Sequence, residues 1–310
     1  HSHSPTTAEE IRRHLEVYRD TDFSRIYWEA SYGDKANYFS DIASVRPSVG
    51  WEHYDRPGIG EEERSWRILR DKNIDPFEVA LDHAHEIGLE FHAGFRVAAF
   101  NFPPPYDHFN RGKSFFNNHP ELRGTSRSGT HSPRLAYTYS ETRRFVVSIL
   151  REIASYPVDG IALLYNRRLP LVDYEPPLVE GFMAQFGEDP RNLDEREPRW
   201  IAYRSGILTQ FMREVRQAMD EMSQRAARSE RIGVSAIVTN NRNENLYYGI
   251  DAEAWVNEGL VDTIIPYSSN PNFNSNEPSW EDVRDAEFWI NLTRDTSTEL
   301  ALNIMPRQMT

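Results

Sequence analysis

The chain contains no cysteine, which excludes disulfide bonds, thiolate nucleophiles and cysteine-ligated zinc or iron–sulfur centres. Long apolar runs are also missing: Ile161-Ala162-Leu163-Leu164 is far shorter than the ~20 residues that span a bilayer, and the mean hydropathy is −0.68. Basic residues are outnumbered, with 35 Lys and Arg against 48 Asp and Glu, which gives a net charge of −13. We therefore expect neither a membrane nor a nucleic acid as a partner.

What the 310 residues do contain is a regular alternation of helical and strand patterns. Asp75 and Pro76, for example, supply a helix cap and a first helical residue, and the apolar stretch from Val158 to Asn166 is typical of a strand buried on both faces. Strands are expected at 25–31, 89–97, 158–166, 232–239, 261–267 and 300–305. Helices are expected at 7–18, 76–87, 142–156, 177–186, 198–228, 251–259 and 280–289.

This alternation predicts one α/β domain over residues 1–310. The loops that follow the strands are longer than those that precede them, and neither Gly-x-Gly-x-x-Gly nor a Walker A sequence is present, so a TIM-type (β/α)8 barrel is favoured over a dinucleotide-binding sheet. Such a barrel has eight strands. Because the sequence opens on a helix and ends on a strand, we expect the first and last strands of the barrel to be absent from it, and we expect a long basic and aromatic loop at about 97–140.

Polar residues at the carboxyl ends of the expected strands are the candidates for a functional site, because substrates of parallel α/β barrels bind there. These residues are Glu29, Asp34, His92, Arg96, Tyr165, Asn166, Arg167, Asn240 and Tyr267. Asp159 begins its strand, so it is expected to have a structural role.

Three glutamates, Glu29, Glu175 and Glu244, lie at the strand ends or in the loops that follow them. Hydrolysis of a glycosidic bond needs a protonated carboxyl group and a second carboxylate as nucleophile or base. Glu175 follows Asp173 and precedes two prolines that stiffen the backbone, Glu244 lies in an amide-rich segment suited to sugar hydroxyls, and Glu29 ends a strand. We predict Glu175 as general acid and Glu29 or Glu244 as the second carboxylate, with the other strand-end residues binding sugar. Solvated loop acids and plain asparagine turns are the alternative interpretation.

The region 96–144 is locally basic, with eight Lys and Arg against three Asp and Glu, a net charge of +5. Guanidinium groups match carboxylates and sulfates, so an anionic glycan is one candidate substrate, and a solvated charge run is the alternative. The histidines do not show the spacing of metal ligands. His83 and His85 point apart on a helix, and His92, His119 and His131 form no ligand motif. We expect no metal and no other cofactor, and a metal-dependent sugar isomerase or lyase is the competing hypothesis.

Several short segments, taken in order, resemble the family-10-like glycosyl hydrolases, which are bacterial glycosidases with a TIM-barrel domain. The segments are Asp75-Pro76 to His85, Gly88-Leu89-Glu90-Phe91-His92-Ala93, Phe116-Asn117-Asn118-His119-Pro120-Glu121, Leu135-Ala136-Tyr137, Val158-Asp159-Gly160-Ile161, Ile201-Ala202-Tyr203-Arg204, Phe211-Met212-Arg213-Glu214, Trp255-Val256 and Gly259-Leu260-Val261-Asp262. The resemblance implies a sugar-polymer substrate, a secreted or periplasmic location, and flanking strands before residue 1 and after Thr310.

One strand departs from the family pattern. Relatives often carry acidic residues after the Asp-Gly pair, where this chain has Ala162 and Leu164. The departure moves the catalytic assignment to Glu29 and Glu175, and it leaves a non-catalytic carbohydrate-binding barrel as the alternative to a hydrolase.

Overall fold

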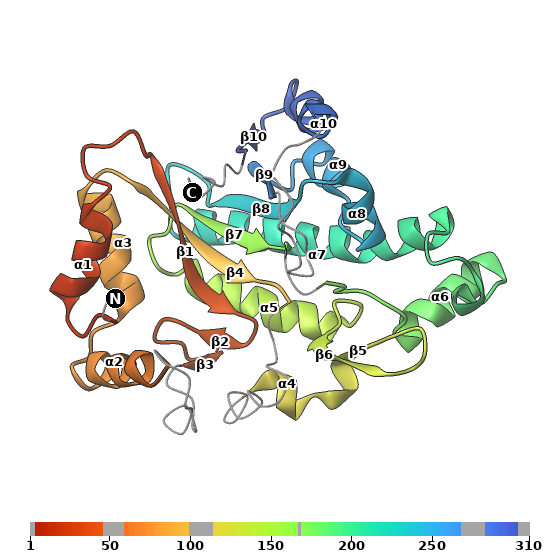
Figure 1. Ribbon diagram of the computed structural model, residues 1–310, viewed down its shortest axis with the longest axis horizontal. Helices are drawn as coiled ribbons and strands as arrows, with labels where there is room; N and C mark the ends of the chain where they lie inside the picture. The colour runs from red at the N-terminus through yellow and green to blue at the C-terminus, as the bar shows by residue number, and fades with distance from the viewer. Residues whose placement is uncertain (1–3, 46–58, 99–113, 167–168, 268–282, 303–310) are drawn as a thin grey trace, which may run out of the picture.

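The computed structural model describes residues 4–45, 59–98, 114–166, 169–267 and 283–302, which form an α/β structure around one large sheet (Figure 1). The sheet has the strand order β10-β9-β8-β7-β4-β1-β2-β3. Its strands are β1 (Arg25–Tyr32), β2 (Lys35–Ala36), β3 (Ser44–Val45), β4 (Glu90–Arg96), β7 (Gly160–Leu164), β8 (Gly233–Thr239), β9 (Thr263–Tyr267) and β10 (Glu299–Leu300). A separate antiparallel hairpin consists of β5 (Arg123–Thr125) and β6 (His131–Leu135).

Within the described residues, six strands form a parallel series that follows the order of the chain: β1, β4, β7, β8, β9 and β10. On its other side, β1 pairs with β2 in the antiparallel direction. A helix precedes each strand of the parallel series, which confirms the predicted alternation and the α/β fold class. These helices are α1 (Ala8–Glu16), α3 (Pro76–Glu86), α5 (Ser140–Ile153), α7 (Pro198–Arg225), α9 (Ala252–Asn257) and α10 (Val283–Thr293). The part of the last expected strand at 303–305 lies outside the described residues.

Local sequence chemistry explains where these elements begin. The Thr7 hydroxyl accepts a hydrogen bond from the Glu10 amide at the start of α1, and the Asp75 carboxylate accepts one from the Phe77 amide at the start of α3. Asp159 also has the structural role that was predicted for it, because its carboxylate accepts hydrogen bonds from the Phe91 amide and from His85. These bonds fix the beginning of β7 beside the beginning of β4.

The structure contains elements that the sequence patterns did not predict. These elements are β2, β3, α2 (Ile59–Asp71), α4 (Phe115–Asn118), the 3-10 helix η3 (Pro120–Leu122), the β5–β6 hairpin, the 3-10 helix η4 (Pro190–Asn192) and α8 (Arg242–Tyr247). Two of them depend on a capping side chain, since Ser114 and Asn241 accept hydrogen bonds from the Asn117 and Glu244 amides. The described part of the expected long loop is therefore structured. The helix α6 (Pro176–Phe186) was predicted and ends at Gly187 with φ 74°.

Small residues line the concave side of the sheet. A Cβ at Gly160 would lie 2.5 Å from the His92 ring, and one at Gly233 would lie 3.3 Å from it, so the two glycines make room for the imidazole. Figure 1 shows the helices on the outside of this sheet, with α5 and α7 running behind β4, β7 and β8. Their inward faces bury apolar side chains such as Val146, Ile149 and Leu208.

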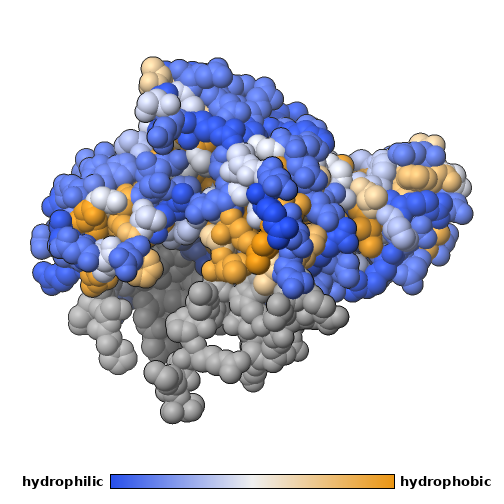
Figure 2. Space-filling model, turned by 90° about the horizontal axis from the view of Figure 1, so that it is seen from above, coloured by the Kyte–Doolittle hydropathy of each residue, from blue (hydrophilic) through white to orange (hydrophobic). Residues whose placement is uncertain are grey.

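The molecular surface is mainly hydrophilic in the view of Figure 2, as the excess of acidic residues predicts, with small hydrophobic patches at the end that carries α1 and α3 and near the middle. Among the helices that the structure describes, none is long and apolar enough to cross a membrane.

Candidate active site

The carboxyl ends of β1 and β4 bring together two of the predicted site residues, Glu29 and Arg96. Arg96 Nε donates a hydrogen bond to the Glu29 carboxylate, and the two side chains keep 29% and 36% of their surface exposed. The register between the strands shifts between Glu29 and Ser31, which marks a β-bulge. Gly94 lies opposite Glu29, and a Cβ there would contact the Glu29 backbone at 3.5 Å. The bulge and the glycine therefore place an accessible carboxylate and its guanidinium partner at the carboxyl ends of the strands, the end at which TIM-barrel enzymes carry their active sites.

The turn after β1 encloses Asp34, and this placement corrects the expectation that its side chain lies open at the rim. The carboxylate is 1% exposed and pairs with Lys35 Nζ at 2.8 Å. It also accepts hydrogen bonds from the Ser114 hydroxyl at 2.6 Å and the Phe116 amide at 3.0 Å. Asp34 thus anchors the start of α4 against the β1–β2 turn, and no oxygen is left for a sugar.

Glu175 is likewise enclosed rather than open to substrate. The residue is 1% exposed, and its carboxylate accepts hydrogen bonds from the Thr138 hydroxyl at 2.8 Å, the Asp173 amide at 3.0 Å and the Thr125 amide at 3.3 Å. Burial raises the pKa of Glu175, and these hydrogen bonds oppose the rise. The raised pKa suits a general acid, but the contacts show Glu175 fastening the β5–β6 hairpin to the loop after β7.

Beside Glu175, the same loop directs Asp173 into a cleft of about 620 Å³. We call this cavity the Asp173 cleft; it is lined by Ser126, Arg127, Ser128, Leu169, Pro170, Asp173, Tyr174, Arg191, Glu195, Arg204, Tyr247 and Tyr248. Burial raises the pKa of Asp173 to about 6, although the nearby cations of Arg204 and Arg134 lower it. A carboxyl group with this pKa can hold a proton at mildly acidic pH, which is the property required of a proton donor.

Arg204 forms the inner wall of the Asp173 cleft and is 4% exposed. Its Nη2 donates to the Tyr247 carbonyl at 2.7 Å, and its guanidinium lies 5.5 Å from the centres of the Trp200 and Tyr247 rings. Among the residues that the structure describes, none bonds to Arg204 Nε. Burial lowers the pKa of Arg204, with the charges of Tyr174 and Asp173 opposing that change.

The remaining predicted residues lie at the carboxyl ends of other strands or in the segments that follow them. Glu244 lies in the first turn of α8, where its carboxylate is 39% exposed and pairs with Arg196 at 3.0 Å. Asn240 and Tyr267 are half-buried neighbours at the ends of β8 and β9, joined by a backbone hydrogen bond of 3.0 Å. Arg167 lies outside the described residues.

Two residues that follow β7 are buried. Tyr165 points away from the concave side of the sheet: its hydroxyl donates to Met212 Sδ at 3.1 Å and its ring packs on Trp255, so the structure places it in the helical layer and corrects its expected place at the rim. Asn166 is 7% exposed, and its Oδ1 accepts no hydrogen bond from the described part of the chain.

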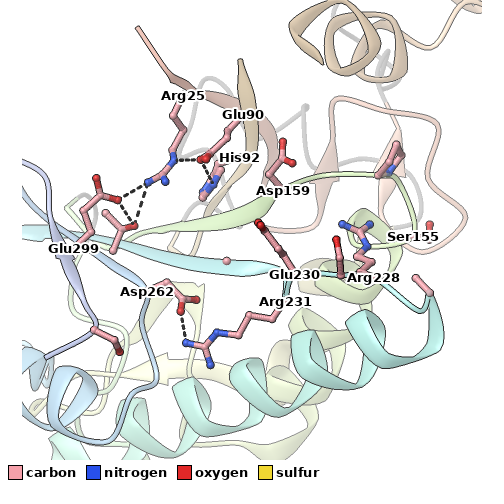
Figure 3. Close-up of a pocket in the computed structure, with 16 residues that line it drawn as sticks. Arg25, Glu90, His92, Ser155, Asp159, Arg228, Glu230, Arg231, Asp262 and Glu299 are labelled. Carbon is pink, nitrogen blue, oxygen red and sulfur yellow. Dashed lines mark hydrogen bonds and ion pairs between the residues drawn. The ribbon is translucent and has the colours of Figure 1, made fainter. Parts of the chain in front are cut away.

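His92 lies at the opposite end of the sheet from Arg96, which corrects the expectation that both reach the rim. The two residues are four positions apart on one strand, or roughly 13 Å. Figure 3 shows His92 beside Arg25 and Glu90 in a hollow of about 1000 Å³ at the amino ends of the strands. Its Nδ1 lies 3.2 Å from the Ser235 hydroxyl, and burial together with the charge of Arg25 lowers its pKa to about 4. In barrels this end serves stability.

Sequence reasoning left Asp173 open between a carboxylate held in place by the nearby prolines and a solvated loop acid, and it passed over Arg204, Tyr247 and Tyr248. The pattern around Arg204 offered one indication: Trp200, Arg204 and Leu208 recur every four positions, so a charged residue stands on the buried face of α7. The two tyrosines lie at the end of an asparagine-capped helix, in a segment that the sequence analysis left open between a sugar-binding stretch and a plain turn. No sequence pattern brings them to the loop after β7. Among the described residues, no group of three or more His, Asp or Glu side chains is arranged to hold a metal ion.

Six adjacent parallel strands with helices on the outside, and an accessible Glu–Arg pair at their carboxyl ends, define an α/β barrel of the TIM type with a polar site at the expected end. The sequence profile of the glycosyl hydrolase-like 10 family matches residues 57–306. The chain therefore belongs to that family, which confirms the resemblance seen in the sequence.

Superposition on the first of three similar solved structures supports the fold. The α-L-fucosidase isoenzyme 2 of Paenibacillus thiaminolyticus superimposes with a TM-score of 0.50 at 13% identity, over 84% of this chain and 32% of that one. A cycloisomaltooligosaccharide glucanotransferase of a Paenibacillus species gives 0.43 at 11% identity, over 76% and 30% of the two chains. The α-galactosidase TtGalA of Thermus thermophilus gives 0.39 at 13% identity, over 73% and 41%. The present chain spans about a third of the length of the fucosidase. No curated protein matches its sequence.

Proposed function

We propose that this chain is the barrel of a glycoside hydrolase that binds a polysaccharide or oligosaccharide across the carboxyl ends of its parallel strands. Membership in a glycosyl hydrolase-like family supports the reaction class. The observation that carries the proposal is the partly exposed Glu29 carboxylate held by Arg96 at a β-bulge. A guanidinium that orients a carboxylate keeps one of its oxygens directed at the substrate, as a nucleophile or base requires.

Of the three carboxylates proposed for catalysis, Glu29 and Glu244 have partly exposed side chains. The Glu175 side chain is buried, and its oxygens are occupied by hydrogen bonds within the protein. We assign the nucleophile or base role to Glu29. The basic region at 96–144 favours an anionic glycan, although Arg143 is engaged in an ion pair with Glu214 at 3.1 Å and Arg127 donates to two backbone carbonyls. The substrate would be reached outside the cytoplasm, in keeping with the family resemblance.

The test is release of reducing ends from a panel of neutral, uronic-acid and sulfated glycans by the wild type and by Glu29→Gln, with and without EDTA. We expect the substitution to lower kcat by at least about 10³-fold while the circular dichroism spectrum and melting temperature stay unchanged. Glu121→Gln, which changes an exposed carboxylate that pairs with His119, is the matched control and should retain full activity. Wild-type rates in Glu29→Gln contradict the assignment.

A non-catalytic carbohydrate-binding barrel is the second candidate, and Ala162 and Leu164 on β7 favour it, because neither side chain can act as an acid or base. Affinity for a glycan without any release of reducing ends by the wild type would select this function. Loss of activity in EDTA would instead favour a metal-dependent reaction.

A further inference from the structure

We propose that the Asp173 cleft is a binding subsite for an acidic sugar, in which Arg204 receives the sugar carboxylate and Asp173 is protonated when the subsite is occupied. The subsite lies between the β5–β6 hairpin, the loop after β7 and α8. The proposal takes from the proposed function only that the ligand is a carbohydrate.

Arg204 is the first reason for this assignment. A guanidinium offers five N–H donors, and in the part of the chain that the structure describes Arg204 donates one hydrogen bond, to Tyr247, and forms no ion pair. Burying a cation that forms no ion pair is costly even beside the Trp200 and Tyr247 rings, so a residue of this kind is normally matched by an anion. The cleft that it lines has room for a sugar ring.

The other walls of the cleft also suit a sugar. Tyr247 and Tyr248 come from the end of α8, with ring centres 5.1 Å apart and their planes at 69°, and aromatic faces of this kind pack on the C–H groups of sugar rings. Tyr247 is held in place, because its hydroxyl donates to Glu195 at 3.1 Å and the Arg196 guanidinium lies 4.6 Å from its ring centre. Arg127 and Arg191 add two further cations to the lining.

The charged groups around Asp173 determine how binding should depend on pH. Arg204 on α7 and Arg134 on β6 favour its ionised form, Glu195 opposes it, and the buried Glu175 lies two positions away on the same loop. With a pKa of about 6, Asp173 is largely charged at pH 7.5 and largely protonated at pH 5.0. An ionised Asp173 repels a bound carboxylate, and a protonated one donates a hydrogen bond to it.

The experiment measures binding to the full chain by isothermal titration calorimetry or ligand-observed NMR. The probes are glucuronate, galacturonate and mannuronate, each paired with its methyl ester, which has nearly the same shape but no charge. The free uronates stay ionised at both pH 5.0 and pH 7.5. We expect at least one uronate to bind on the order of tenfold more tightly at pH 5.0 than at pH 7.5, while its methyl ester binds weakly and equally at both.

Three variants make the test specific. Asp173→Asn should bind the uronate at pH 7.5 as tightly as the wild type does at pH 5.0, and its affinity should no longer depend on pH. Arg204→Gln should lose the preference for the uronate over its ester. Asp194→Asn, a matched control whose carboxylate caps the nearby Arg196 amide and does not line the cleft, should behave as the wild type.

Equal affinity for acid and ester, no binding of any uronate, or an unchanged pH dependence in Asp173→Asn would overturn the proposal. If Arg204→Gln fails to fold, the Asp173→Asn result still decides it. Every readout here is binding, so the subsite is tested separately from the hydrolase activity. If the chain binds a uronate but releases no reducing ends, hydrolysis is refuted and the subsite is supported.

Discussion

Arg25 at the start of β1 and Glu299 on β10 form an ion pair of 2.8 Å although 274 positions separate them in the sequence. The same guanidinium lies 2.6 Å from Glu90 on β4 and 3.2 Å from the Thr263 hydroxyl on β9. One side chain on the first parallel strand therefore contacts the second, fifth and sixth of the described series. These contacts require the sheet to curl towards a barrel, even though no backbone hydrogen bonds join β1 to β10 in the part of the chain that the structure describes.

This contact predicts that Arg25→Met destabilises the fold by about 2 to 3 kcal/mol, because it removes the one guanidinium that bonds to Glu90, Glu299 and the Thr263 hydroxyl. Glu299→Gln should cost less than about 1 kcal/mol, since the Glu299 side chain is 57% exposed. Urea unfolding at pH 7.5 measures both free energies. Arg19→Met removes an exposed pair with Glu16 and is the control. Equal losses for Arg25→Met and the control would contradict a bridging role.

The buried pair of Asp34 and Lys35 should be the point at the carboxyl ends of the strands where a substitution destabilises the fold most. Asp34→Ala removes the carboxylate that pairs with the buried Lys35 ammonium group and accepts hydrogen bonds from the Ser114 hydroxyl and the Phe116 amide, so we expect a loss of about 3 to 5 kcal/mol in the free energy of unfolding. The loss is read from urea denaturation. Asp41→Ala, at an exposed position, provides the comparison and should change stability by less than about 0.5 kcal/mol. A small effect of Asp34→Ala would mean that solvent reaches the pair.

Arg96 is predicted to act as a positioning residue for Glu29. Arg96→Lys keeps the positive charge but loses the planar fork, so kcat should fall by about 10- to 100-fold while KM changes little. The readout that separates positioning from folding is the split between kcat and KM at an unchanged melting temperature. Arg144→Lys, which alters an exposed pair with Glu141, serves as the control. A rise in KM alone would show that Arg96 binds substrate instead.

His92 should make the protein sensitive to mild acid. Its native pKa is about 4, whereas an unfolded histidine titrates near 6.5, so below pH 6.5 the unfolded chain takes up a proton that the native chain does not. Stability is full above pH 6.5 and falls towards pH 4, by about 3 kcal/mol from this group.

His92→Gln removes the titrating group, so the difference in unfolding free energy between pH 7.5 and pH 4.5 should shrink by about 2 to 3 kcal/mol. Chemical denaturation at the two pH values measures this difference. His131→Gln, at an exposed position on β6, should leave it unchanged. If the acid sensitivity persists in His92→Gln, other titrating groups cause it and the prediction is wrong.

The sequence alone determined the order of the elements and the fold class. Hydrophobic periodicity and caps such as Thr7 and Asp75 depend on neighbouring residues, so the six parallel strands and the helices between them could be predicted, as could the structural role of Asp159. The family resemblance also rests on residues in order along the chain.

The tertiary structure decided which polar residues face solvent. Glu29 and Arg96 meet because a bulge aligns two strands, whereas Asp34, Glu175 and Tyr165 are covered by segments distant in sequence. The Asp173 cleft joins the loop after β7, α7 and the end of α8, which no local pattern relates. Burial and ionisation depend on these distant neighbours, because a side chain is desolvated by whatever packs over it and not by the residues beside it in the chain.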